Sequence, residues 1–283
     1  IVKELEAEGW LGGTVGIEKW SPVPNRAVSE AVEAELVSHG STIVDASALV
    51  REVRRIKSPR EIAYVEEAVR ICDAGLEALR RFLKPGVSEL EAWAELLLGM
   101  AAEGGEPAGI HECVVVGPAE LGHMFSSTRR IKQGDSLFAD PSGVRYRYHG
   151  NVAKAFFMGE PPKEAVRIAE IEAGAYPILC EHAKAGTSVR DVNKVLREYY
   201  VDAGVWGLHE WTGGYELGIS FPPDWVGEFV FTVDDEDPEE VFEAGMVTNY
   251  ESMVHYAMID TIVYEADGAR ALSSLPHELV VID

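Results

Sequence analysis

Apolar residues recur at helical spacing over a long segment that follows residue 58. Seven of them lie three or four residues apart, at Ile62, Val65, Val69, Cys72, Leu76, Leu79 and Leu83. Such spacing puts the side chains on one face of an α-helix. Ser58 precedes the pattern, and Glu61 follows Ser58 by three residues, which is the capping box of a helix start. The sequence therefore predicts a long helix after Ser58, with one face packed on a sheet.

The same order of helix, stop and helix occurs twice. Residues 84–88 (KPGVS) are echoed by residues 184–188 (KAGTS), each between two helical stretches. Gly ends helices readily, and Ser88 with Glu91 forms a second capping box. The repeat predicts a duplicated unit in which strands follow each helix pair. Because stop and cap residues are common, a chance recurrence is the alternative explanation.

Strand-like apolar runs follow each pair of predicted helices. They cover residues 112–116, 136–139, 146–158, 229–233, 246–253 and 258–265. Runs of this length between turn residues are typical of β-strands. The order of helices and strands therefore predicts an α+β domain.

The first 56 residues predict a smaller unit with its own elements. Residues 1–10 have the pattern of the end of an amphipathic helix, residues 14–18 and 41–45 that of strands, and residues 27–38 that of a helix. We therefore expect two domains, residues 1–56 and residues 57–283. Since Ile1 is not an initiator residue and no signal-peptide pattern follows it, we expect that the natural chain begins upstream.

Composition and charge restrict the partners of the chain. Its 283 residues are 47% apolar, which suits a globular protein with a full core. No apolar run reaches the ~20 residues of a membrane span. The formal net charge of -23 argues against binding to nucleic acid or to anionic membranes, because both need basic patches. We expect a small-molecule substrate, no nucleic acid and no membrane partner.

Cysteine usage bears on the compartment. Cys72, Cys113 and Cys180 are scattered without a C-x-x-C spacing, so neither a disulfide framework nor a zinc site is predicted. We therefore expect a reducing compartment and a cytoplasmic protein. The acidic residues within 234–240 predict a solvated surface loop, with a binding role as the alternative.

The run LFADPSGVRYRYHGNVAKAFF carries the first candidate chemistry. It resembles the strand pair of the creatinase/prolidase/methionine-aminopeptidase superfamily, whose metal-binding members place two Asp at this spacing. Here Asp140 is followed eleven residues later by Asn151. The resemblance implies the α+β pita-bread fold, with duplicated helix-helix-strand halves around an antiparallel sheet and a remnant of a smaller α/β N-terminal domain. It also implies an active cleft between the halves, on the sheet.

The other ligand positions of that superfamily can be followed in the flanking motifs. By this resemblance Tyr215 stands in place of a His, Glu251 is a retained Glu, and Ile259 stands in place of the last Glu. Two bridged cations need several anionic oxygens and an imidazole. The resemblance therefore implies no catalytic metal pair and no cofactor, while a single weakly bound Mg²⁺ or Ca²⁺ stays open.

The same resemblance implies catalytic groups that need no metal. His123 falls where creatinase carries its general acid/base, and His is suited to proton transfer near neutral pH. Glu251 matches a creatinase Glu that binds the cationic guanidino group, and Asp140 is expected to be a nucleophile or a second anchor. A carboxylate inside an apolar strand also predicts a cationic ligand or a partner Arg. The alternatives are structural: a His satisfied within a loop, and an Asp that caps the turn at 141–143.

A second likeness concerns residues 146–149 (YRYH) and 215–225 (YELGISFPPDW). They resemble segments of ectoine hydrolases, ring-opening amidine hydrolases of the same fold that also dispense with the metal set. This implies a pocket wall of Tyr215, Phe221 and Trp225, and a substrate contact at His149. His149 has the alternative of a strand residue that faces solvent or a neighbour. Ectoine hydrolases carry a Glu at the position of Asp140 and an apolar residue at that of Glu251.

The hypothesis from the sequence is a metal-independent hydrolase of C-N bonds. Its substrate would be a small amidine, guanidine or cyclic nitrogen compound, and the chain would form a homodimer like its relatives. One alternative is a metal-dependent Xaa-Pro dipeptidase or aminopeptidase with a rearranged site. Another is a catalytically inactive protein of this fold that is used for binding.

Overall fold

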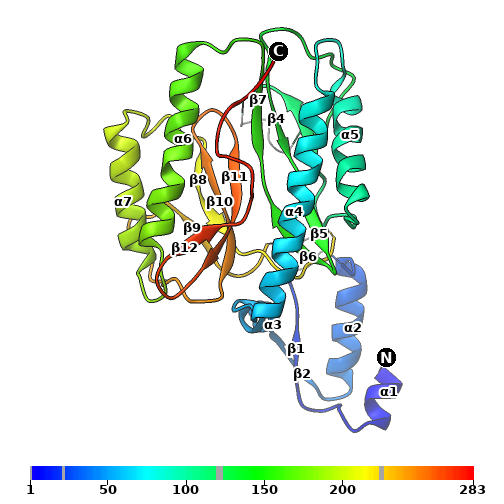
Figure 1. Cartoon of the computed structure of the whole chain (residues 1–283). Helices are drawn as coiled ribbons and strands as arrows, with labels where there is room; N and C mark the ends of the chain where they lie inside the picture. The colour runs from blue at the N-terminus through cyan, green and yellow to red at the C-terminus, as the bar shows by residue number, and fades with distance from the viewer. Residues whose placement is uncertain (1, 21–22, 119–123, 223–225) are drawn as a thin grey trace. The chain divides into compact units, whose positions relative to one another are not determined.

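A computed structural model describes the chain except residues 1, 21–22, 119–123 and 223–225. The chain divides into two compact units, Ile1–Arg54 and Arg55–Asp283. Figure 1 gives the order of their elements along the chain. No helix in the described ranges is both long enough and apolar enough to cross a membrane.

The smaller unit contains a pair of parallel strands and short helices. Its elements are α1 Val2–Ala7, β1 Thr14–Ile17, α2 Arg26–Ser38, β2 Thr42–Asp45 and α3 Ser47–Arg54. Thr14 on β1 pairs with Thr42 on β2. The side chain of Asn25 accepts a hydrogen bond from the N–H of Val28 and so caps α2. Helix α3 has no counterpart among the predicted elements.

The larger unit consists of two halves with the same order of helices before strands. The first half comprises α4 Pro59–Phe82, α5 Glu89–Ala102, β3 Cys113–Val116, β4 Ser136–Asp140, β5 Ser142–Arg145, β6 Tyr148–Asn151 and β7 Lys154–Met158. The second half comprises α6 Lys163–His182, α7 Val189–Asp202, β8 Trp211–Tyr215, β9 Val230–Thr232, β10 Val247–Met253, β11 Met258–Tyr264, β12 Ala269–Ala271 and β13 Val280–Ile282.

Corresponding turns show that the halves are structural repeats. Gly86 and Gly186 both have positive φ, 95° and 86°, a conformation that favours Gly. The N–H of Gly86 donates to the carbonyl of Ile131, and the N–H of Gly186 donates to that of Phe242, both at 2.8 Å. In each half, the turn between the two helices is therefore bonded to the loop before a strand, β4 in the first half and β10 in the second. The predicted duplication is confirmed.

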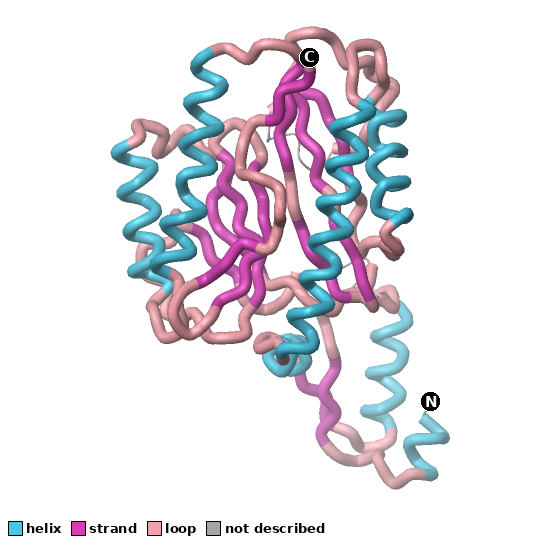
Figure 2. The backbone as a smooth tube through the Cα atoms, in the orientation of Figure 1, coloured by secondary structure: helices cyan, strands magenta, loops and turns pink. Residues whose placement is uncertain are grey.

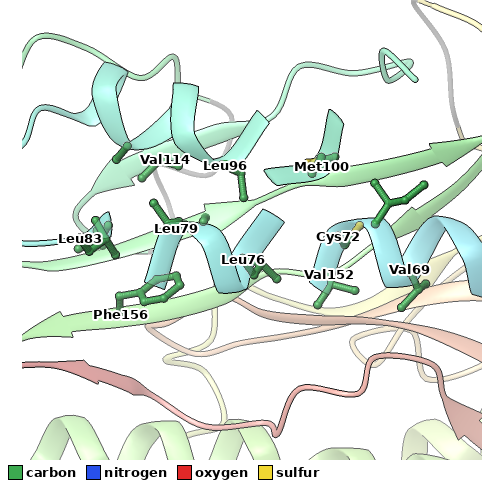
Figure 3. Packing of buried hydrophobic residues seen from close by; sticks show 14 of the residues in the cluster. Val69, Cys72, Leu76, Leu79, Leu83, Leu96, Met100, Val114, Val152 and Phe156 are labelled. Carbon is green, nitrogen blue, oxygen red and sulfur yellow. The ribbon is translucent and has the colours of Figure 1, made fainter. Parts of the chain in front are cut away.

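The capping boxes and the apolar face of α4 form as predicted. Ser58 with Glu61, and Ser88 with Glu91, bond reciprocally at the starts of α4 and α5. Helix α4 packs on α5 and on strands β5 and β6, and Figure 3 shows Leu76 and Leu79 of its apolar face in the buried cluster. Burying a side chain of this size stabilises the fold by about 2 kcal/mol.

Two main sheets form, each with its own helix pair (Figure 2). One has the strand order β12-β11-β10-β8-β9 and the other β13-β7-β4-β3, while β5 and β6 form a hairpin. Ala153 and Ile259 join the sheets, because the N–H of Ala153 donates to the carbonyl of Ile259 at 3.0 Å. This bridge brings the β6–β7 segment of the first half beside β11 of the second half.

The strand expected over residues 146–158 is wrong as a single element. Residues 146–147 form the turn of the β5–β6 hairpin, with φ of 50° at Tyr146 and 66° at Arg147. Such values are unusual for residues other than Gly. The carboxylate of Glu106 accepts hydrogen bonds from the N–H groups of both residues, at 2.7 and 3.3 Å. This tertiary contact offsets the unfavourable backbone conformation, which the local sequence does not indicate.

Candidate active site

Asp140 and Asn151 lie side by side, on β4 and β6. Nδ2 of Asn151 donates to Oδ1 of Asp140 at 2.7 Å and to the carbonyl of Pro141 at 3.3 Å. The backbone of Asn151 is held as well, since its N–H donates to the hydroxyl of Thr261 at 2.8 Å. Asn151 is fully buried. The first carboxylate of the site therefore faces an amide donor that cannot turn away without breaking these bonds.

Asn249 on β10 continues this arrangement toward the second carboxyl. Its Nδ2 donates to Oδ1 of Asn151 at 3.1 Å and to Oε1 of Glu251 at 2.7 Å. Its Oδ1 accepts the N–H of Tyr215 at 2.9 Å. Asn249 and Glu251 share one face of the sheet because side chains alternate along a strand.

Tyr215, at the end of β8, completes the set. Its side chain is hydrogen-bonded to the carboxyl of Glu251. We call the hydrogen-bonded series Asp140, Asn151, Asn249, Glu251 and Tyr215 the carboxyl–amide chain. It brings together three site residues that were predicted from the sequence, Asp140, Glu251 and Tyr215, although they belong to different strands.

The neighbouring floor of the site is apolar. It consists of buried side chains from both halves: Cys113, Val115, Phe138, Ala153, Ala257 and Ile259. Ile259 is directly opposite Glu251 in the β10–β11 pairing. A carboxyl on an apolar floor loses hydration, and this disfavours its charged form.

Burial raises the pKa of Glu251 from 4.5 to about 8, and the nearby Asp140 adds to the effect. Hydrogen bonds from Tyr215 and Asn249 act in the opposite direction without cancelling it. Glu251 is therefore mainly protonated at neutral pH. In the described residues its bonded partners, Asn249 and Tyr215, are both uncharged, so the predicted partner Arg is replaced by neutral donors.

Glu112 is a further acidic neighbour that the sequence did not single out. It directly precedes β3, whose first residue, Cys113, pairs with Asp140. Burial raises the pKa of Glu112, and the charge of Asp140 contributes in the same direction. A signal was present in the sequence, since a carboxylate directly before a buried strand is costly without a partner.

The residues of the site do not fit a two-metal centre. In the ranges that the structure describes, no three His, Cys, Asp or Glu side chains come together as a metal-binding group. The side-chain amides of Asn151 and Asn249 turn N–H donors toward the two carboxyls of the site. Metal ions instead bind oxygen or imidazole acceptors. Tyr215 and Ile259 occupy the places where the family resemblance implies metal ligands.

His149 lies outside the carboxyl–amide chain. It is fully buried, its Nε2 accepts the N–H of Gly109 at 2.9 Å, and its Nδ1 lies 3.0 Å from the carbonyl of Arg147. The Gly109 bond makes Nε2 the acceptor, so Nδ1 carries the proton. Burial lowers the pKa of His149 to about 4, which keeps the ring neutral. The ring of His149 thus links two backbone segments, and its predicted substrate contact stays a prediction.

Phe221 lies beside the turn of the β5–β6 hairpin, at the end of the hairpin away from Asn151. The guanidinium of Arg147 stands 5.4 Å from the centre of the Phe221 ring, and Phe221 is 62% exposed. The hairpin turn begins next to Tyr148, which is three residues, or about 10 Å, along β6 from Asn151. The structure therefore does not bring Phe221 together with the carboxyl–amide chain. His123 and Trp225, the other nominated residues, lie outside the described residues.

Comparison with known families gives one match over most of the chain. A model of metallopeptidase family M24 matches residues 63–271.

Similar curated proteins include both hydrolases and dipeptidases. The chain is 27% identical over 297 residues to an ectoine hydrolase of Halomonas elongata, covering 98% of this chain and 72% of that protein. It is 24% identical over 276 residues to an Xaa-Pro dipeptidase of Pyrococcus horikoshii, covering 94% of this chain and 75% of the relative.

Solved structures resemble the whole fold. An X-Pro aminopeptidase from Thermotoga maritima superimposes with a TM-score of 0.82 at 18% identity, over 99% of this chain and 77% of that one. A dipeptidase from Pyrococcus horikoshii gives a TM-score of 0.83 at 22% identity, over 99% and 76%. These likenesses confirm the predicted α+β pita-bread fold.

Proposed function

This chain belongs to metallopeptidase family M24, whose relatives here are hydrolases of C-N bonds, and we propose that it hydrolyses such a bond without a metal centre. The proposed substrate is a small amidine, guanidine or cyclic nitrogen compound with a cationic nitrogen. The carboxyl–amide chain is the observation that carries the proposal.

The charge balance of the site favours a cationic substrate. Glu251 is buried and bonded to the uncharged Asn249 and Tyr215, and Asp140 faces the uncharged Asn151. Two neighbouring carboxyls repel each other when both are ionised. A cation bound between Asp140 and Glu251 removes this repulsion and lowers the pKa of Glu251. Substrate binding at neutral pH is therefore coupled to release of a proton from Glu251.

The hydrolysis itself needs a proton acceptor for water and a proton donor for the leaving nitrogen. The water oxygen forms a bond to the substrate carbon, the C-N bond breaks, and the nitrogen leaves with a proton. Asp140 as a carboxylate takes the proton of the attacking water, or attacks the carbon itself to form an intermediate that water then cleaves. His123 is the proposed donor to the leaving nitrogen, as the family resemblance implies, while Glu251 orients the cation.

Likeness to the ectoine hydrolase of Halomonas elongata supports this substrate class. Likeness to an Xaa-Pro dipeptidase of Pyrococcus horikoshii supports a second candidate, a metal-dependent peptidase. The two candidates differ in substrate and in dependence on a metal ion.

The test is a turnover screen of the full-length protein. The substrates are ectoine, creatine, related cyclic amidines and Xaa-Pro dipeptides, each with and without EDTA. We expect turnover of a cationic C-N substrate that EDTA leaves unchanged and that the Asp140→Asn variant abolishes. Turnover of dipeptides alone, lost with EDTA and regained with Mn²⁺, would establish the peptidase and overturn the proposal.

A further inference from the structure

Asn249 lies at the centre of the carboxyl–amide chain, although no sequence motif singles it out. It is fully buried, and both N–H groups of its amide have acceptors, Oδ1 of Asn151 and Oε1 of Glu251. Its Oδ1 accepts the N–H of Tyr215. A buried amide is favourable only when it is bonded in this way. Its three contacts reach β6, β8 and a neighbouring position on β10.

Backbone groups fix the orientation of both amides in this series. The N–H of Tyr215 can only donate, so Oδ1 of Asn249 must face it and Nδ2 must face Glu251. The carbonyl of Pro141 can only accept, so Nδ2 of Asn151 faces Pro141 and Asp140. The orientation of the two amides, which is often ambiguous, is therefore determined, and each carboxyl receives an N–H donor.

We propose that Asn249 is a positioning residue that acts through Asn151 to hold the carboxyls of Asp140 and Glu251 within reach of one small cationic ligand. Neutral N–H donors then hold the two carboxyls in place, as bridging cations do in a metal centre. The proposal rests on the function proposed above. It adds a residue and a means of holding the site together that the catalytic scheme does not contain.

Removing the amide has two separable effects. In Asn249→Ala, Glu251 loses a donor that favours its ionised form, and Asn151 loses the bond that orients its Oδ1. In Asn249→Asp, the shape is kept and Oδ1 still accepts the N–H of Tyr215, but a carboxyl faces both Asn151 and Glu251. A purely structural role predicts the larger defect in Ala, whereas the proposed role predicts the larger electrostatic change in Asp.

The experiment is an infrared titration of the full-length protein with isotope-labelled glutamate, which follows the protonated carboxyl of Glu251. Glu112 and Glu172, whose pKa values are also raised, are assigned with Gln variants. We expect the titration of Glu251 to move upward by about one pH unit in Asn249→Ala and further in Asn249→Asp. The acidic limb of the pH profile of kcat/KM, where Glu251 ionises to bind the cation, should move in the same order.

Asn193 provides a matched control. It is also buried, and its Nδ2 donates to the carbonyls of Thr232 and Asp235 at 2.8 and 3.1 Å. Asn193→Ala should destabilise the protein without moving the titration of Glu251. If Asn249→Ala does not fold, the isosteric Asn249→Asp still gives the measurement.

Each result separates this inference from the proposed function. An unchanged Glu251 titration in the Asn249 variants, or an equal shift in Asn193→Ala, overturns the positioning role even if cationic substrates are turned over. The expected shifts without turnover of any cationic substrate support the positioning role and contradict the hydrolase.

Discussion

Replacing Glu251 by Gln should make the protein more stable, by an amount that grows with pH. Gln has nearly the same shape, keeps an oxygen that can accept the N–H of Asn249, and never ionises. The wild-type carboxyl is forced to stay protonated on its apolar floor while the same group in the unfolded chain ionises freely. The substitution removes this difference.

The magnitude follows from the raised pKa of Glu251, about 8 in the folded protein against 4.5 ordinarily. The folded-state pKa of Glu251 lies above the unfolded value. The contribution of its protonated carboxyl to the free energy of unfolding is therefore complete below pH 4.5 and is lost as pH rises toward 8. At 1.36 kcal/mol per pH unit the full loss is about 5 kcal/mol, and the loss at pH 7 is about 3 kcal/mol. Glu251→Gln should recover these amounts.

The assay is equilibrium unfolding in urea at pH 5, 6, 7 and 8, roughly spanning the interval between the two pKa values. The quantity of interest is the difference in free energy of unfolding between Glu251→Gln and wild type. Glu164→Gln, an exposed change on α6, is the control and should show no comparable rise with pH. A difference for Glu251→Gln that stays constant from pH 5 to 8 would refute the assignment of a buried, protonated Glu251.

Three further predictions test the rest of the site. The triple variant Asn151→Asp, Tyr215→His, Ile259→Glu should bind Mn²⁺ in calorimetry where wild type binds at least tenfold more weakly; equal binding would show that these positions do not converge. His149→Ala should lower the free energy of unfolding by about 2–4 kcal/mol and leave the pH profile of kcat/KM unchanged, whereas a shifted profile would restore its substrate role. Gly143→Ala should cost more than about 3 kcal/mol, because its Cβ would lie 1.9 Å from a backbone oxygen of α4; thermal unfolding at the wild-type temperature would contradict this packing.

Local rules gave the parts of the fold that depend on near neighbours. The Ser58–Glu61 box and the apolar face of α4 rest on residues three or four apart, and both form as expected. Strands β5, β8, β12 and β13 were not predicted. Trp211–Tyr215 contains two Gly and lacks an alternating pattern, and its strand conformation comes from pairing with β9 and β10.

Candidate residues were found where a motif carried them. Asp140, Tyr215 and Glu251 stand in segments that resemble family motifs, and the structure places them together. Asn249 carries no such signal, because an Asn on a strand is chemically neutral until its partners are known. His149 stands in a segment with a family likeness, yet its ring nitrogens face the backbone at Gly109 and Arg147.

The family, the repeated helices and the loss of metal-ligand residue types can be recognised from residue identity and short spacing alone. How the two carboxyls are held depends on contacts between distant parts of the chain. Asn151 and Asn249 are separated by 98 residues, and they meet because the bridge between Ala153 and Ile259 joins the two sheets. Burial on that shared floor gives Glu251 its proton, and burial is a property of the assembled fold that no local pattern contains.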